Sequence, residues 1–290
     1  MKINNRKIAI LTDTGSSITP KEAIDLDIYL LPLQIINGDK TYSDLVDLDT
    51  KQIYDMIYNE IPLTTSLPAL SIIYDTIEQI KKDGYESIIA VPLTNGLSST
   101  ATTIEAVARE LKIPLTVVNT YSTCQIQRHV VLRIKKLLNS QLPLDEVISI
   151  VQYEIDNSGS YILASDLNHL KRGGRLTPLA ASFANMLKIY PILQLNKSTE
   201  GKIDVYTKVR TRKKALIQLV DSSIPITNKE SYMFYIINSD DLESSCFIKD
   251  ELLSRGIKED MIKIENINSV VSVHVGMKCL ALQTIRVNKV

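Results

Sequence analysis

The sequence predicts an α/β protein of two domains, the first with a parallel sheet and the second a mixed α+β domain. Two observations predict this. Short apolar runs alternate with amphipathic helical stretches over residues 1–158, as in βαβ units. In residues 159–290 strands dominate, and one pair has hairpin spacing. We place the boundary in the small polar stretch 156–160, and 290 residues suffice for two domains.

The elements of the first half follow from hydrophobic periodicity. Compact apolar runs predict buried strands, and apolar residues recurring every three or four positions predict helices. The predicted strands cover 7–11, 28–36, 87–93 and 115–119. The predicted helices cover 68–80, 99–111, 122–138 and 143–156. Because parallel strands end at the same edge of a sheet, we expect the polar turns after Leu11 and Leu93 to face one crevice.

The second half is predicted from shorter signals. Strands are expected at 161–165, 189–195, 202–207, 231–237 and 261–264. The second and third of these form a hairpin across Gly201, and a basic helix follows at 210–220.

Composition excludes several classes of function. Lys plus Arg equals Asp plus Glu, at 33 each, so the chain has no net positive charge that would attract nucleic acid. Three widely spaced cysteines argue against a disulfide framework and favour a reducing cytoplasm. The polar N-terminus is unlike a signal peptide, and no apolar run approaches a membrane-spanning length. Phosphate-loop, dinucleotide, zinc-protease and nucleophile-elbow motifs are absent, so we expect no cofactor and no metal.

The run from Asn168 to Leu176 is the most informative stretch, because three cations and a histidine surround a Gly-Gly pair. Glycines permit positive φ and the close approach of a ligand. Arg175 follows with a fork of donors suited to a carboxylate or a phosphate. A surface turn with solvated charges is the alternative interpretation of this run.

Two hydroxyl-rich segments each precede a predicted helix. Residues 94–103 hold six hydroxyls at the end of a strand, more than the one side chain that capping needs. Such a helix start can bind an anion. The second segment, 64–68, is predicted as the N-terminal cap of the helix at 68–80, with Pro68 in its first turn.

Three further titratable residues have open interpretations. His274 lies in an apolar context, where a hydrogen-bonded structural role is the more common one. His129 is expected at the surface beside Arg128. Asp13 follows a strand and can serve as an acid or base, or cap the next turn.

Six segments follow one another along the chain: IAILTDTGSS at 8–17, TTSLP at 64–68, LTNGLSST at 93–100, LNHLKRGGRL at 167–176, KIYPIL at 188–193 and KVRTRKKA at 208–215. Read in this order, they resemble the DegV family of fatty-acid-binding proteins. The resemblance covers most of the chain. It implies two α/β domains with one long-chain fatty acid in a tunnel between them, and no catalytic chemistry of the protein's own.

The resemblance also implies the residues that hold the fatty-acid carboxylate. The hydroxyl-side roles are carried over to Thr65, Ser66, Thr94, Asn95 and Ser98, the arginine role to Arg175 and the histidine role to His274. Family members of this kind present the acid to a separate fatty acid kinase, which makes an acyl phosphate for phospholipid synthesis. Transient contact with a membrane fits such a role.

The chain departs from the usual family pattern at several positions. Leu67 and Ala69 replace a Gln and a Ser, Thr94-Asn95 replace two Ser, Ser99 and Ala101 replace a Gly and a Tyr, Tyr190 replaces a Lys, and Gly276-Met277-Lys278 replace a glycine-rich segment. These departures bear on headgroup, chain selectivity and partner docking more than on the fold.

Two alternatives to a fatty-acid carrier are kept. One is a phosphotransferase or hydrolase that uses Asp13 as general base and Arg175 to stabilise the transition state. The other is a regulatory domain with a vestigial pocket. For the carrier, apolar residues of 179–187 and of the helix at 68–80 are the expected tunnel walls.

Overall fold

The first half of the chain forms a four-stranded parallel sheet, as predicted. The computed structural model describes residues 7–185, 189–225, 227 and 229–287. The strand order is β2-β1-β6-β7, with β1 at Ile8–Asp13, β2 at Tyr29–Leu31, β6 at Ser87–Val91 and β7 at Leu115–Val117.

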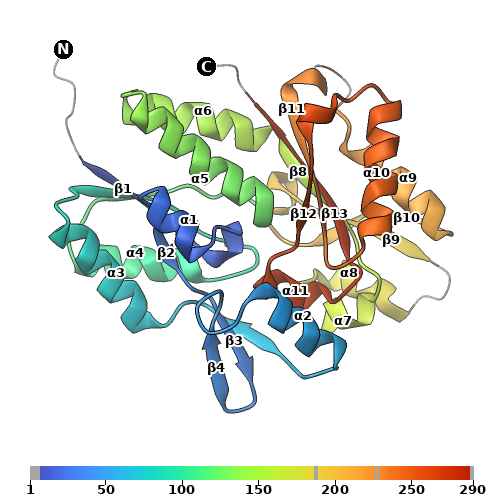
Figure 1. The fold of residues 1–290 in the computed structure, drawn as a ribbon, viewed down its shortest axis with the longest axis horizontal. Helices are drawn as coiled ribbons and strands as arrows, with labels where there is room; N and C mark the ends of the chain where they lie inside the picture. The colour runs from blue at the N-terminus through green and yellow to red at the C-terminus, as the bar shows by residue number, and fades with distance from the viewer. Residues whose placement is uncertain (1–6, 186–188, 226, 228, 288–290) are drawn as a thin grey trace.

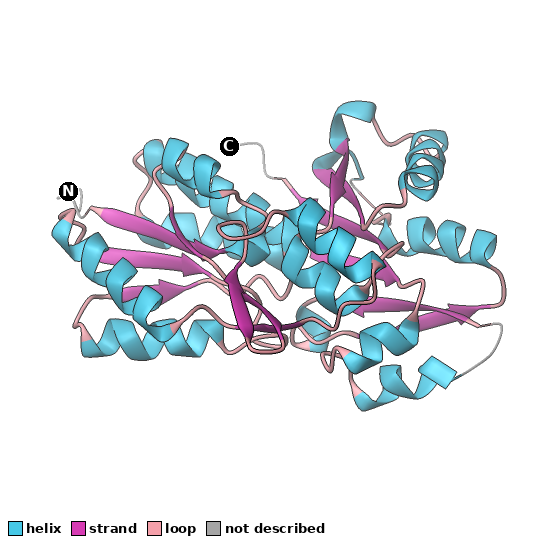
Figure 2. Ribbon diagram, turned by 60° about the horizontal axis from the view of Figure 1, so that its bottom comes forward, coloured by secondary structure: helices cyan, strands magenta, loops and turns pink. Residues whose placement is uncertain are grey.

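Helices cover both faces of this sheet (Figure 2). Because side chains alternate along a strand, Ile10 packs toward one face and Leu11 toward the other. The first face is covered by α1 (Pro20–Asp25) and α5 (Cys124–Asn139), and the second by α3 (Leu70–Lys82) and α4 (Thr100–Glu110). This is the arrangement expected of βαβ units.

The second half forms a six-stranded mixed sheet of order β10-β9-β8-β13-β11-β12. Its strands are β8 (Ser158–Leu163), β9 (Tyr190–Leu195), β10 (Asp204–Val209), β11 (Tyr232–Asn238), β12 (Ile262–Asn266) and β13 (Leu280–Arg286). The predicted hairpin is confirmed as β9–β10, although β10 begins two residues later than predicted. One face carries α9 (Arg212–Ser223) and α10 (Leu242–Ser254).

The two sheets share one hydrophobic core. It joins Ile10 of the first sheet, Ile126 of α5 and Ile162 of the second sheet. The helices α5 and α6 (Leu144–Asp156) lie between the sheets in Figure 1. The predicted domain boundary falls where β8 begins. The division into two domains at this point stays a prediction.

A third, small sheet of order β4-β3-β5 extends from the first lobe. It contains β3 (Gln34–Asn37), β4 (Lys40–Ser43) and β5 (Thr64–Ser66), and α2 (Thr50–Tyr58) packs on it. The short helix α11 (Ser269–Val275) contacts α2, β5 and α7 (Leu167–Arg172), so the second half of the chain closes over this sheet (Figure 1). The helix α8 (Pro178–Ser182) follows α7.

Three sequence predictions about local structure are wrong. The apolar run 28–36 is two strands, because Pro32 lies between β2 and β3 and has no N–H for a ladder. Residues 64–66 pair with β3 as a strand, and α3 begins after Ala69 without a side-chain cap. His129 is mostly buried, with Nδ1 at 2.9 Å from the Tyr235 hydroxyl, because α5 faces the second sheet and not solvent.

Candidate headgroup-binding cavity

A cavity of about 70 Å³ lies where α11, β5, the loop after β6 and the turn after α7 meet. Five polar side chains line it, namely Thr65, Ser66, Ser98, Arg175 and His274. The remaining wall is apolar and consists of Leu33, Leu67, Leu93, Leu97, Ile203, Val270, Val271 and Val275. The cavity is therefore polar at one side and apolar elsewhere, and both halves of the chain contribute to it.

The Gly-Gly turn uses its two glycines for different reasons. Gly173 ends α7 in a right-handed conformation, and a Cβ at this residue would lie 3.0 Å from Nδ1 of His274. Gly174 has φ of 71°, a conformation that side-chain-bearing residues rarely adopt. The first glycine makes room for the imidazole, and the second turns the chain so that Arg175 enters the cavity wall.

The carbonyl of Gly173 accepts hydrogen bonds from two side chains of the cavity, Arg175 and His274. Nη1 of Arg175 donates to it at 2.8 Å, and Nδ1 of His274 lies 3.2 Å away. Burial lowers the pKa of Arg175. Burial, together with the nearby Arg175 charge, lowers the pKa of His274 to about 4, so the imidazole is neutral near pH 7. Arg175 therefore supplies the positive charge of the site.

The partners of His274 determine its tautomer. Because the Gly173 carbonyl only accepts, Nδ1 must carry the proton. Nε2 of the neutral ring is then an acceptor, and the Thr65 hydroxyl at 2.6 Å donates to it. This bond joins residues 209 positions apart in the sequence. It ties β5 of the first lobe to α11.

Ser98 lies at the start of α4, within the predicted hydroxyl cluster. Its Oγ is 2.8 Å from the Thr100 hydroxyl and accepts from the Thr100 backbone N–H at 3.3 Å. Ser99, the N-cap residue, makes no side-chain cap bond. Of the hydroxyl cluster at 94–103, only Ser98 lines the cavity.

Thr94 and Asn95 lie outside the cavity lining. Thr94 is fully buried, and its hydroxyl has no hydrogen-bond partner among the described residues. The turn of the β9–β10 hairpin covers it, because a Cβ at Gly201 would lie 2.0 Å from Thr94 Oγ1. Asn95 is exposed. Of the seven residues carried over by resemblance, five surround one cavity and these two do not.

Asp13 has structural partners on every side. Its carboxylate accepts from the Gly15 N–H at 3.0 Å, the Leu93 N–H at 2.8 Å and the Gln127 amide at 3.0 Å. Burial raises its pKa to about 6. The bond to Leu93 brings the two predicted turns together, but Asp13 does not line the cavity. This geometry gives Asp13 no contact with a ligand there.

The predicted tunnel walls lie elsewhere. No residue of 179–184 and none of the helix at 68–80 lines this cavity, and the side chains of residues 185–187 are outside what the structure describes. The apolar wall comes instead from the segment before β3, the loop after β6 and α11. The sequence contains both end signals of the helix α11. Asn268 caps its N-terminus, and Gly276, with φ of 74°, ends it.

No described helix is long and apolar enough to cross a membrane. Within the described ranges, no three His, Cys, Asp or Glu side chains gather as metal ligands would.

Comparison with known proteins places the chain in a family. A profile described as an uncharacterised protein of the DegV family matches residues 7–287. A DegV domain-containing protein of Listeria innocua is 30% identical over 282 residues, covering 96% of this chain and 98% of the relative. One from Halalkalibacterium halodurans is 28% identical over 279 residues, covering 95% of this chain and 97% of that protein.

Comparison with solved structures leads to the same family. A fatty-acid-binding DegV family protein of Streptococcus agalactiae is 31% identical, with a TM-score of 0.88 over 98% of this chain and all of that one (100%). DegV of Bacillus subtilis, described as a fatty-acid-binding protein, shares the fold at 24% identity, with a TM-score of 0.81 over 97% of this chain and 100% of that chain. Both names describe binding proteins and no enzyme. With nearly the whole chain matched in sequence and in fold, this protein belongs to the DegV family.

Proposed function

We propose that this protein binds one long-chain fatty acid, holds its carboxylate beside Arg175, and presents it to a separate fatty acid kinase. The observation that carries the proposal is the cavity in which Arg175 and two serine hydroxyls converge on an otherwise apolar wall. The description of the Streptococcus agalactiae relative as fatty-acid-binding supports it.

A carboxylate matches the donors at the polar side. The Arg175 guanidinium carries five N–H donors in a fixed fork, of which Nη1 bonds to Gly173. A second donor pair on the fork suits the two oxygens of a carboxylate. Ser66 and Ser98 add hydroxyls within the same lining. A buried carboxylate needs such partners, because without them it would take up a proton.

His274 and Thr65 respond to the arriving charge. A carboxylate beside the imidazole raises its pKa and favours a proton on Nε2. Nε2 then donates to the Thr65 oxygen. The Thr65 O–H no longer donates to Nε2 and is free to donate to the carboxylate. Binding of the anion is in this way coupled to proton uptake by His274.

The acyl chain supplies most of the affinity. Each buried methylene contributes about 0.8 kcal/mol, so roughly fifteen give on the order of 10 kcal/mol before entropic costs. The cavity of about 70 Å³ has the volume of about two water molecules, so the chain must part the apolar side chains that meet there. The polar side orients the ligand.

The occupant is identified by mass spectrometry of the purified, denatured protein. We expect fatty acid at a near-equimolar amount, and oleate or palmitate should bind to the delipidated protein. With ATP and the fatty acid kinase of the same organism, acyl phosphate should form and be trapped as the hydroxamate. A pocket that is always empty and that rejects both added acids would overturn the proposal.

Replacing Arg175 by glutamine should weaken oleate binding about 10- to 100-fold, since a hydrogen bond to a charged group contributes about 1.5–3 kcal/mol. Titration of delipidated protein with oleate and with oleyl alcohol measures this. Only the wild type should prefer the acid.

The matched control is Arg172→Gln. Arg172 is three residues earlier, its side chain is 69% exposed, and it lies 4.0 Å from Asp166 and outside the cavity. It should bind oleate like the wild type. Equal losses in the two variants, or none in Arg175→Gln, would show that Arg175 does not hold the headgroup.

A further inference from the structure

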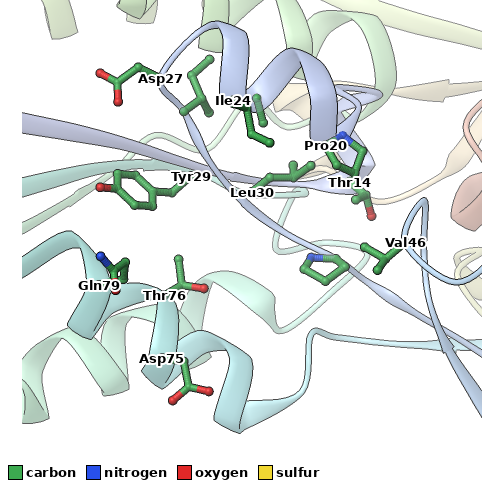
Figure 3. Close-up of a pocket in the computed structure, with 13 residues that line it drawn as sticks. Thr14, Pro20, Ile24, Asp27, Tyr29, Leu30, Val46, Asp75, Thr76 and Gln79 are labelled. Atoms are coloured by element: carbon green, nitrogen blue, oxygen red, sulfur yellow. The ribbon is translucent and has the colours of Figure 1, made fainter. Parts of the chain in front are cut away.

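A groove of about 700 Å³ lies away from the headgroup cavity, between α1 and α3 at the edge of the parallel sheet. Figure 3 shows Tyr29 and Leu30 of β2 along its floor, Ile24 of α1 above, and Asp75, Thr76 and Gln79 of α3 below. No part of the proposed fatty-acid function uses it.

The floor of the groove is a sheet edge. β2 pairs with β1 on one side, and among the described residues no strand pairs with its other side. An edge strand presents backbone N–H and C=O groups that another strand can satisfy. The groove is thus shaped to receive an extended chain.

Two exposed apolar side chains stand at the rim of the groove. Ile24 is 80% exposed and Val46 64% exposed, and both line the groove. Single exposed apolar residues are ordinary. Because most of the Ile24 side chain is exposed, it is available to a partner.

The groove is also acidic. Asp27, which lies near Ile24 just after α1, and Asp75 of α3 line it, and no lysine or arginine does. Lys135 lies 3.1 Å from Asp27 and compensates that charge, so the uncompensated carboxylate is Asp75 on α3. The carboxylate of a fatty acid in this groove would be repelled by Asp75. A second copy of the chain in a two-fold contact would place the same acidic face against itself, with the same repulsion.

We propose that this groove binds an extended segment of another protein in which apolar and cationic side chains alternate, added as a strand to β2. Successive side chains of a strand point to opposite faces. The apolar ones would pack on Ile24 of α1, and the cationic ones would approach Asp75 of α3. The two helices thus specify the two halves of the alternation.

The probe is a capped, fluorescein-labelled hexapeptide in which valine and lysine alternate, titrated into the full chain by fluorescence anisotropy. Three peptide controls are used: the same residues in two blocks, alternating valine and glutamate, and the first peptide with alternate backbone amides methylated. The alternating valine-lysine peptide should bind about tenfold more tightly than each control, because only it combines backbone pairing with both side-chain faces.

Variants locate the contact. Asp75→Lys should weaken binding of the valine-lysine peptide about three- to tenfold, less so at high salt, and should improve binding of the valine-glutamate peptide. Ile24→Ser should weaken both. The matched controls are Asp250→Lys and Leu242→Ser on exposed positions of α10. None of the four changes touches the fatty-acid cavity.

Three results would overturn the proposal. The block peptide could bind as tightly as the alternating one. Asp75→Lys and Ile24→Ser could bind the peptide like the wild type. Sedimentation could show a dimer that Ile24→Ser dissociates, which would make a second copy the occupant.

Discussion

Alanine at Gly201 is expected to destabilise the fold by about 2–4 kcal/mol. Gly201 has φ of 71°, and its missing side chain makes room for Thr94, whose Oγ1 would lie 2.0 Å and Cβ 3.1 Å from an added Cβ. The left-handed conformation costs about 1 kcal/mol, and overpacking a buried contact adds about 1–3 kcal/mol. Urea denaturation of wild type and variant measures the difference.

Gly84 provides the control for the backbone strain alone. Its φ is 80°, yet a Cβ there would meet nothing within 4 Å. Gly84→Ala should therefore cost only about 1 kcal/mol. If Gly201→Ala costs no more than this, the two turns are not in the close contact described.

A second substitution tests the collision itself. The Thr94 hydroxyl is buried without a partner, so Thr94→Ala should cost little alone. In the Gly201→Ala background it should recover part of the loss, because it removes the atom that the new Cβ meets. A double-mutant cycle gives this coupling, and simple additivity would contradict it.

Replacing Asp44 by asparagine should alter the pH dependence of stability. Asp44 is fully buried, and the Ser269 hydroxyl at the start of α11 donates to its Oδ1. Burial raises the pKa of Asp44 from 3.8 to about 6. The folded state therefore binds this proton more tightly than the unfolded state, and the stability that protonation provides is lost as pH rises from about 4 to 6.

The asparagine variant lacks this loss. Relative to wild type, its free energy of unfolding should improve by about 2 kcal/mol between pH 4 and pH 7, since each pKa unit is worth about 1.4 kcal/mol and the unfolded carboxyl is already more than half ionised at pH 4. Burial lowers the pKa of His129 and of His274 to about 4, which changes stability in the opposite direction over a similar range. Comparing variant with wild type at each pH cancels these contributions.

Urea titrations from pH 4 to pH 7.5 give the difference. The matched control is Asp250→Asn, which makes the same chemical change at an exposed position of α10. A pH-independent difference for Asp44→Asn would mean that Asp44 titrates alike in the folded and unfolded states. The same experiment reports on the cavity, because Asp44 anchors the helix that carries His274.

Local pattern predicted the framework of the parallel sheet. The alternation of buried strands and amphipathic helices depends on residues within about ten positions of one another, so β1, β6, α3 and α5 could be placed from the sequence. Three strands, β4, β5 and β13, and six helices, α1, α2, α7, α8, α10 and α11, were not predicted. For β5, the hydroxyl-rich segment had the composition of a helix cap, and pairing with β3 overrode it.

The sequence by itself determined the family, the fold class and most of the polar side of the cavity. The order of the motifs along the chain indicated seven site residues, and five of them line one cavity. Only the tertiary structure decided which side chains meet. Thr65 reaches His274 across 209 positions, and the hairpin turn at Gly201 covers Thr94, which leaves it outside the lining. Such contacts depend on how the lobes pack, and that packing sums many weak interactions between distant segments that no local pattern encodes.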